Sequence, residues 1–294
     1  MPNLHDIDRR IKSVSSTRQI TRTMQMVAAA KVRRSNERVE QATPYSNSMV
    51  EMLANVANCV GGSENALLST HEEIKNVLMI VVVSDRGLAG AFNNNVLKEV
   101  ENISKEKQAA GANVQYVACG KKAIGYYSYR KIEPVLQYAG LSADPTVEEA
   151  SAIAAYAIDG YAKGEIDEVR VVYNHAKNAA EQRLYEETVL PVDTSAFTSD
   201  DGEGAQTEGD MLFEPNAEGV LDSLLPAYVR TVIYHALIDS AAAEQGARRT
   251  AMMAATDNAD EMVETLTRLY NRVRQGAITT EITEIVSGAA ALED

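Results

Sequence analysis

The C-terminal stretch of the chain, from about Ala227 to Asp294, contains no proline and predicts one very long helix. At about 1.5 Å per residue this helix would extend for about 100 Å, several times what an ordinary globular domain needs. A helix of that length needs support along its side. The stretch therefore restricts the fold to one in which another long element runs beside it.

The apolar positions of this helix follow the 3.5-residue repeat of a left-handed coiled coil. The predicted seam is Ile238, Ala241, Gln245, Arg248, Met252, Ala255, Ala259, Met262, Leu266, Leu269 and Val273, and a second stripe follows at Ile278, Ile282, Ile285 and Ala289. Small residues in the seam allow a partner helix to lie close. Gln245 and Arg248 are polar where an apolar residue is expected, so each either sets the register or contacts another chain.

A partner helix is predicted at the other end of the chain, where no proline occurs between Asn3 and Thr43. Its apolar stripe, with helical spacing, is Ile7, Ile11, Val14, Ile20, Met24, Val27, Ala28 and Val32. Pro44 predicts a kink or a brief interruption before the helix continues to about Ala57. Two long helices at opposite ends of the chain predict an antiparallel coiled coil that extends from a globular domain.

The middle of the chain alternates between strand and helix patterns. The run Asn76–Val83 is continuously apolar and β-branched, as in a parallel sheet covered on both faces. Further strands are predicted at 114–119, 132–138, 168–174 and 184–190, and helices at 93–110, 121–129 and 146–163. This alternation predicts an open α/β sheet of Rossmann-like type with right-handed crossovers.

The predicted domains follow from these elements. They are an N-terminal coiled-coil helix at 1–58, a central α/β domain at 74–195, an acidic loop at 196–213 and a C-terminal coiled-coil helix at 214–294. The segment Thr198–Asp210 is acidic and poor in apolar residues, which predicts a mobile surface loop.

The charge is spread unevenly along the chain, whose net charge is −14. Residues 1–43 carry nine Lys and Arg against four Asp and Glu, a balance of +5, so the remainder carries −19. A basic helix on an acidic protein can be a solvated face, or it can meet nucleic acid, an anionic membrane or an acidic protein. Nucleic acid is disfavoured because the acidic remainder would repel it and no aromatic residues interleave the arginines. An acidic protein partner is favoured over it.

Residues with catalytic or ligand-binding spacing are not found. The turn Ser84–Gly90 follows the first strand, where a doubly wound sheet binds phosphate, but its two glycines do not make GxGxxG. The four histidines lack metal-ligand spacing. Cys59 and Cys119 are isolated, which predicts two free thiols in a reducing compartment. No catalytic, cofactor-binding or metal-binding residue is predicted.

No signal peptide or membrane-spanning run is predicted either, because the charged N-terminus is not followed by an apolar segment. We therefore expect a soluble or peripheral protein that is not secreted by that route.

Three motifs resemble the gamma subunit of F-type ATP synthases, the central rotor shaft of that enzyme. They are ITRTMQMVAAAKVRRS at Ile20–Ser35, SDRGLAGAFN at Ser84–Asn93 and ITTEITEIVSGAAA at Ile278–Ala291. Their order and spacing also fit, and the similarity covers essentially the whole chain. Each motif is long enough to make coincidence a poor explanation.

The resemblance implies a non-catalytic rotor subunit of bacterial type. In this family the two terminal helices form an antiparallel coiled coil inside a ring of three alpha and three beta subunits, and the α/β domain contacts epsilon and the membrane rotor ring of proteolipid subunits. Proton flow turns the shaft, which drives catalytic sites expected on the beta subunits. This implies a peripheral protein on the cytoplasmic side of the inner (plasma) membrane. The residues alone leave a second reading open, a nucleotide-binding α/β enzyme with helical oligomerisation arms.

The resemblance also implies which residues contact the catalytic subunits. These are Met24, Lys31, Arg33, Arg34, Arg248, Gln275 and Thr279. Met24 matches a rotor methionine near an acidic lever loop, although its spacing suits a core methionine equally well. Met253 stands where the family often has lysine, and the dithiol insertion of the chloroplast type is missing, so thiol regulation is not expected.

Overall fold

The computed structural model describes residues 3–60, 65–71, 73–141, 144–178, 181–193, 214 and 216–293, with side chains for all of these except 57–60 and 289–293. The predicted acidic loop Thr198–Asp210 and the side chains of Cys59 and Ala289 lie outside this described part. The chain divides into two compact units, one of residues 1–28 with 249–294 and one of residues 29–248. Each is described by itself.

The two long terminal helices are confirmed. Helix α1 spans Leu4–Val60 and helix α5 spans Ala217–Glu293. Pro44 lies inside α1, so the chain there stays helical rather than breaking. Helix α5 begins ten residues earlier than Ala227 and includes Pro226. A proline lacks an N–H and leaves a carbonyl one turn back without its helical partner, but it does not end either helix.

The 29–248 unit contains the predicted sheet, with five strands in the order β3-β2-β1-β4-β5. The strands are β1 Asn76–Val82, β2 Asn113–Cys119, β3 Leu136–Tyr138, β4 Glu168–Ala176 and β5 Gln182–Leu190. Strands β1 to β4 are parallel, whereas β5 pairs antiparallel with β4. The sheet is therefore mixed, with a hairpin at one edge.

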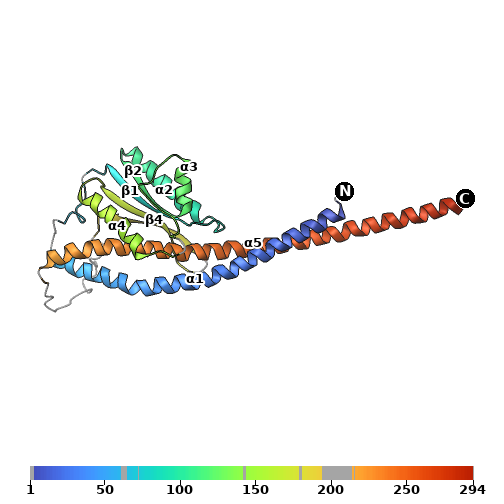
Figure 1. The fold of residues 1–294 in the computed structure, drawn as a ribbon, viewed down its shortest axis with the longest axis horizontal. Coiled ribbons are helices and arrows are strands. Elements are labelled where there is room, and N and C mark those ends of the chain that lie inside the picture. The colour runs from blue at the N-terminus through green and yellow to red at the C-terminus, as the bar shows by residue number, and fades with distance from the viewer. Residues whose placement is uncertain are drawn as a thin grey trace. The chain divides into compact units, whose positions relative to one another are not determined.

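Both faces of this sheet are covered by helices (Figure 1). Helices α2 (Phe92–Ala109) and α3 (Lys121–Tyr129) pack on one face, and Met79 and Val81 point into that core. Helix α4 (Val147–Ala162) packs on the other face with parts of α1 and α5, where Leu78 and Ile80 are fully buried. Alternate β1 side chains thus enter two different cores, which explains why the strand is apolar throughout.

Two elements differ from the sequence prediction. The edge strand expected at 132–138 is reduced to β3 at 136–138. Lys131 has a positive φ of 58°, and Pro134 has no N–H to donate to a ladder, so pairing begins only after them. The antiparallel direction of β5 was also not predicted, because a strand's own sequence does not encode the direction of its neighbour.

In the other unit, residues 4–28 of α1 run antiparallel to the 249–293 part of α5. The hydroxyl of Thr256 lies 2.8 Å from that of Thr21, and Arg18 forms a 2.8 Å ion pair with Asp260. At the paired positions, residue numbers therefore rise along α1 as they fall along α5. An antiparallel coiled coil is confirmed within this unit.

The seam of this coiled coil is narrower than the sequence pattern indicates. Ala28, Met252 and Ala259 are buried as expected, but Met262 is 54% exposed and Ile20 is 57% exposed. A single partner helix covers about one side chain per turn, and Thr21 and Thr256 take central positions that an apolar pattern overlooks. The predicted placement of Met262 and Ile20 in the seam was wrong.

Candidate functional site

The loop after β1, residues 83–91, lies where the strand order reverses, between the adjacent strands β1 and β4. In doubly wound sheets this switch point is the usual ligand crevice. Here it is filled by the chain's own side chains. The Ser84 amide donates to Asn93 Oδ1 at 2.9 Å, and Ser84 Oγ lies 2.9 Å from the same oxygen and 2.5 Å from the Arg86 carbonyl.

The side chain of Asp85 ties the loop after β1 to the ends of the two strands beyond it. Its Oδ1 accepts hydrogen bonds from the backbone N–H of Lys121, at the start of α3, at 3.0 Å and from that of Gly140, after β3, at 2.9 Å. Gly120 has a φ of 105°, and a Cβ there would lie 2.2 Å from the Val83 carbonyl oxygen. The loop after β1 is therefore held closely against the turns that follow β2 and β3.

The same loop is held against helix α5. Phe92 packs with Ala243, and Arg248 Nη2 donates to the Gly87 carbonyl oxygen at 3.3 Å. Arg248 also pairs with Glu244 at 2.5 Å. The two charged residues are only 8% and 2% exposed. The guanidinium of Arg248 thus joins the switch-point loop to the helix, and its predicted contact with another chain stays a prediction.

The predicted basic contact residues of α1 lie on its surface. Lys31, Arg33 and Arg34 are all exposed. Arg33 forms a 3.0 Å ion pair with Glu37 one turn along the helix, while Lys31 and Arg34 make no ion pair within the described part of the chain. Two cationic side chains are therefore available to an acidic partner.

Met24 lies in the coiled-coil unit and is half-buried. It is three residues after Thr21 and four before Ala28, both of which are buried, so it shares their face of α1. Its side chain is therefore partly covered and partly accessible. Both roles that its sequence position suggested are compatible with this placement.

The last turns of α5 carry Gln275 and Thr279, both of which are exposed. The Thr279 hydroxyl donates to the Gln275 carbonyl oxygen at 2.9 Å, which leaves both side chains at the surface. The stripe at Ile278, Ile282 and Ile285 is 46% to 65% exposed. The sequence pattern identified this stripe without assigning it as a contact surface.

Groups able to do chemistry are not assembled in the described residues. No cluster of His, Cys, Asp or Glu there could hold a metal ion. The Cys119 thiol is fully buried, and burial raises its pKa to about 12, so it stays protonated. In the same residues, no helix is long and apolar enough to cross a membrane.

An open α/β sheet domain, together with two long terminal helices that pair antiparallel in a unit of their own, defines a coiled-coil α/β protein. Residues 3–292 match the family model described as ATP synthase. The chain is 41% identical over 293 residues to the ATP synthase gamma chain of Symbiobacterium thermophilum, covering 99% of both chains. It is 42% identical to that of Desulforamulus reducens, covering 100% of both. The chain belongs to the ATP synthase gamma chain family.

Solved structures agree with this assignment. The chain is similar to a chain in the central stalk and c-ring structure of Tetrahymena thermophila mitochondrial ATP synthase, with a TM-score of 0.57 and 25% identity over 80% of this chain and 99% of that one. It also has the fold of a chain in the Euglena gracilis mitochondrial ATP synthase, with a TM-score of 0.63 and 18% identity over 98% and 94% of the two chains.

Proposed function

We propose that this chain is the central-stalk rotor subunit of a proton-translocating F-type ATP synthase. It transmits torque from the membrane rotor ring to a hexamer of three alpha and three beta subunits and so couples proton flow to ATP synthesis and hydrolysis. The catalytic sites lie on the beta subunits. The observation that carries the proposal is the exposed apolar stripe on the last turns of α5, because a helix that stays in water has no use for it.

The physical requirement for this task is a stiff, asymmetric shaft. Two helices joined by the Thr21–Thr256 and Arg18–Asp260 contacts are stiffer than one. A rotating asymmetric surface presents a different face to each catalytic subunit in turn. Each orientation then favours one conformation of that subunit, which is a shift of populations rather than a chemical step by this chain.

The contact residues divide by their place on the helices. Exposed cationic groups on α1 would face acidic surface of the catalytic subunits, exposed groups near the end of α5 would face their collar loops, and the half-buried methionine would face the acidic lever loop. Arg248 would have to release Gly87 to reach a partner. The proposed contacts are Met24, Lys31, Arg33, Arg34, Arg248, Gln275 and Thr279.

The remaining partners are epsilon and the proteolipid ring, which would meet the 29–248 unit. The protein would then be held on the cytoplasmic side of the inner membrane through these partners. The acidic composition, with 42 Asp and Glu against 28 Lys and Arg, supports the absence of nucleic acid from this set.

The decisive experiment is native mass spectrometry of the tagged chain, purified from gently solubilised membranes of its own cell. We expect one copy of this chain with three copies each of two larger nucleotide-binding chains. Recovery of the chain alone, or as a homodimer, would overturn the proposal. Failure of the isolated chain to bind ATP tightly would separate the rotor from the enzyme alternative.

A further inference from the structure

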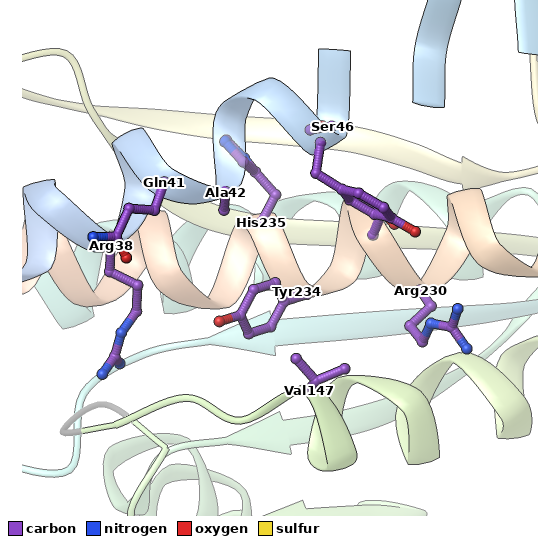
Figure 2. Close-up of a pocket in the computed structure, with 10 residues that line it drawn as sticks. Arg38, Gln41, Ala42, Ser46, Val147, Arg230, Tyr234 and His235 are labelled. Atoms are coloured by element: carbon purple, nitrogen blue, oxygen red, sulfur yellow. The ribbon is translucent and has the colours of Figure 1, made fainter. Parts of the chain in front are cut away.

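A cavity of about 450 Å³ lies within the 29–248 unit, between α1, α4 and α5 (Figure 2). Helix α1 contributes Arg38, Ala42 and Tyr45 to its wall, and α5 contributes Arg230 and Tyr234. The volume falls within the range of small-molecule pockets. None of the residues proposed to contact the catalytic subunits is among its described lining residues.

The charge of the lining is cationic in a protein that is strongly acidic. None of the described lining residues is Asp or Glu. Arg230 is exposed and makes no ion pair with any described residue. Arg38 pairs with Asp144 at 2.5 Å, and its side chain remains 41% exposed. An anion entering the cavity would therefore meet one free guanidinium and one that is already neutralised.

The rest of the lining is apolar or aromatic. Tyr45 is 58% exposed, Val147 is 48% exposed, and Tyr234 is half-buried. Figure 2 shows Tyr234 between Arg38 and Arg230, with Val147 facing it. These side chains give the cavity an apolar and aromatic part of its lining that an apolar ligand group could cover.

The start of α4 contributes little positive potential. Val147, the first residue of this 16-residue helix, lies at the cavity wall. The first turn carries Glu148 and Glu149, and Glu149 forms a capping box with Thr146, so these carboxylates offset the positive end of the helix dipole. The anion site therefore depends on the arginines.

We propose that this cavity binds a small organic anion that has an aromatic or alkyl body and a single carboxylate, sulfonate or phosphate group. The anionic group pairs with Arg230, and the body lies against Tyr45, Tyr234 and Val147. Inorganic phosphate would satisfy the arginine but leave the apolar wall in water, so it binds weakly. A bound ligand touches three helices at once and therefore stabilises the unit.

The test is calorimetric titration of the full-length chain with four probes. Naphthalene-1-sulfonate represents a soluble aromatic anion and octyl sulfate, below its micelle concentration, represents a single-chain lipid. Naphthalene-1-sulfonamide is the neutral isostere, and inorganic phosphate is the anion alone. At least one amphipathic anion should bind with one-to-one stoichiometry, at least tenfold tighter than the isostere and phosphate. Tighter binding of naphthalene-1-sulfonate would identify a soluble aromatic anion as the natural ligand, and tighter binding of octyl sulfate would identify a single-chain lipid.

Two variants and a control locate the site. Arg230→Gln removes an exposed guanidinium and should weaken binding at least tenfold, and Ala42→Phe should do the same by filling the cavity. Arg268→Gln removes an arginine that is 68% exposed on the same helix outside the cavity, and it should change affinity by less than twofold. Wild-type affinity in Arg230→Gln, equal binding of the neutral isostere, or no binding of either anion at millimolar concentration would each overturn the proposal.

Discussion

The buried pair of Glu244 and Arg248 offers the sharpest test of how α5 is joined to the switch-point loop. Replacing Arg248 by Met removes the 2.5 Å ion pair and the donor to Gly87 while keeping an apolar stem. Glu244, only 2% exposed, would then be left as a buried carboxylate without this counter-charge. Removing one partner of a buried pair costs about 3–5 kcal/mol in other proteins.

Arg248→Met should therefore lower the free energy of unfolding of the 29–248 unit by about 3–4 kcal/mol at pH 7. The double variant Glu244→Gln/Arg248→Met should recover most of the loss at pH 7.

The assay is urea unfolding of the full-length chain followed by tyrosine fluorescence. Of the 13 tyrosines, only Tyr270 lies outside the 29–248 unit, and tryptophan is absent, so the signal reports this unit. Lys163→Met is the control, because Lys163 and Asp159 form an i,i+4 pair whose side chains are 57% and 65% exposed. It should leave the urea midpoint almost unchanged. A loss below about 1 kcal/mol for Arg248→Met, or no recovery in the double variant, would refute the reasoning.

Three further outcomes are expected. Gln275→Leu should reduce ATP-driven proton pumping in inverted membrane vesicles without changing the unfolding midpoint, since Gln275 is exposed. Gln108→Leu on the surface of α2 is the control. Undiminished pumping by Gln275→Leu would remove Gln275 from the proposed contacts. Gly120→Ala should lower the unfolding free energy by about 2 kcal/mol or more, because φ is 105° and the new Cβ would clash with Val83; a neutral effect would mean that the β1 end can shift. In a Cys59→Ser background, Cys119 should not react with a thiol reagent at pH 8 until the unit unfolds, because burial raises its pKa to about 12. Rapid labelling of the native chain would contradict this burial.

The helices and strands could be predicted from the sequence, but the side of each long helix that faces its partner could not. The β1 run and the proline-free terminal stretches identified the sheet and the two long helices, because the burial of a strand and the length of a helix depend on the residues of that segment itself. Which side of a helix faces its partner depends on where that partner lies. Met262 matched the heptad pattern, yet it is exposed, while Thr256 occupies the covered position. The repeat alone did not distinguish the two.

Arg248 shows the same limit at the candidate site. Its place in an apolar seam indicated that it had a specific partner, and resemblance to the family suggested another chain. The structure provides partners for it inside the chain, at Glu244 and Gly87. Sequence separation explains why this was missed, because Gly87 lies 161 residues away and becomes a neighbour only when the switch-point loop packs on α5.

The contacts of the loop after β1 explain how a fold associated with ligand binding can serve a mechanical role. Asp85 on this loop satisfies the backbone donors of Lys121, after β2, and of Gly140, after β3. The same loop gives its Gly87 carbonyl oxygen to Arg248 on α5. Because one short loop holds both sets of contacts, it connects the carboxyl ends of the strands to the long helix, and a displacement of the helix at Arg248 is passed directly to the sheet.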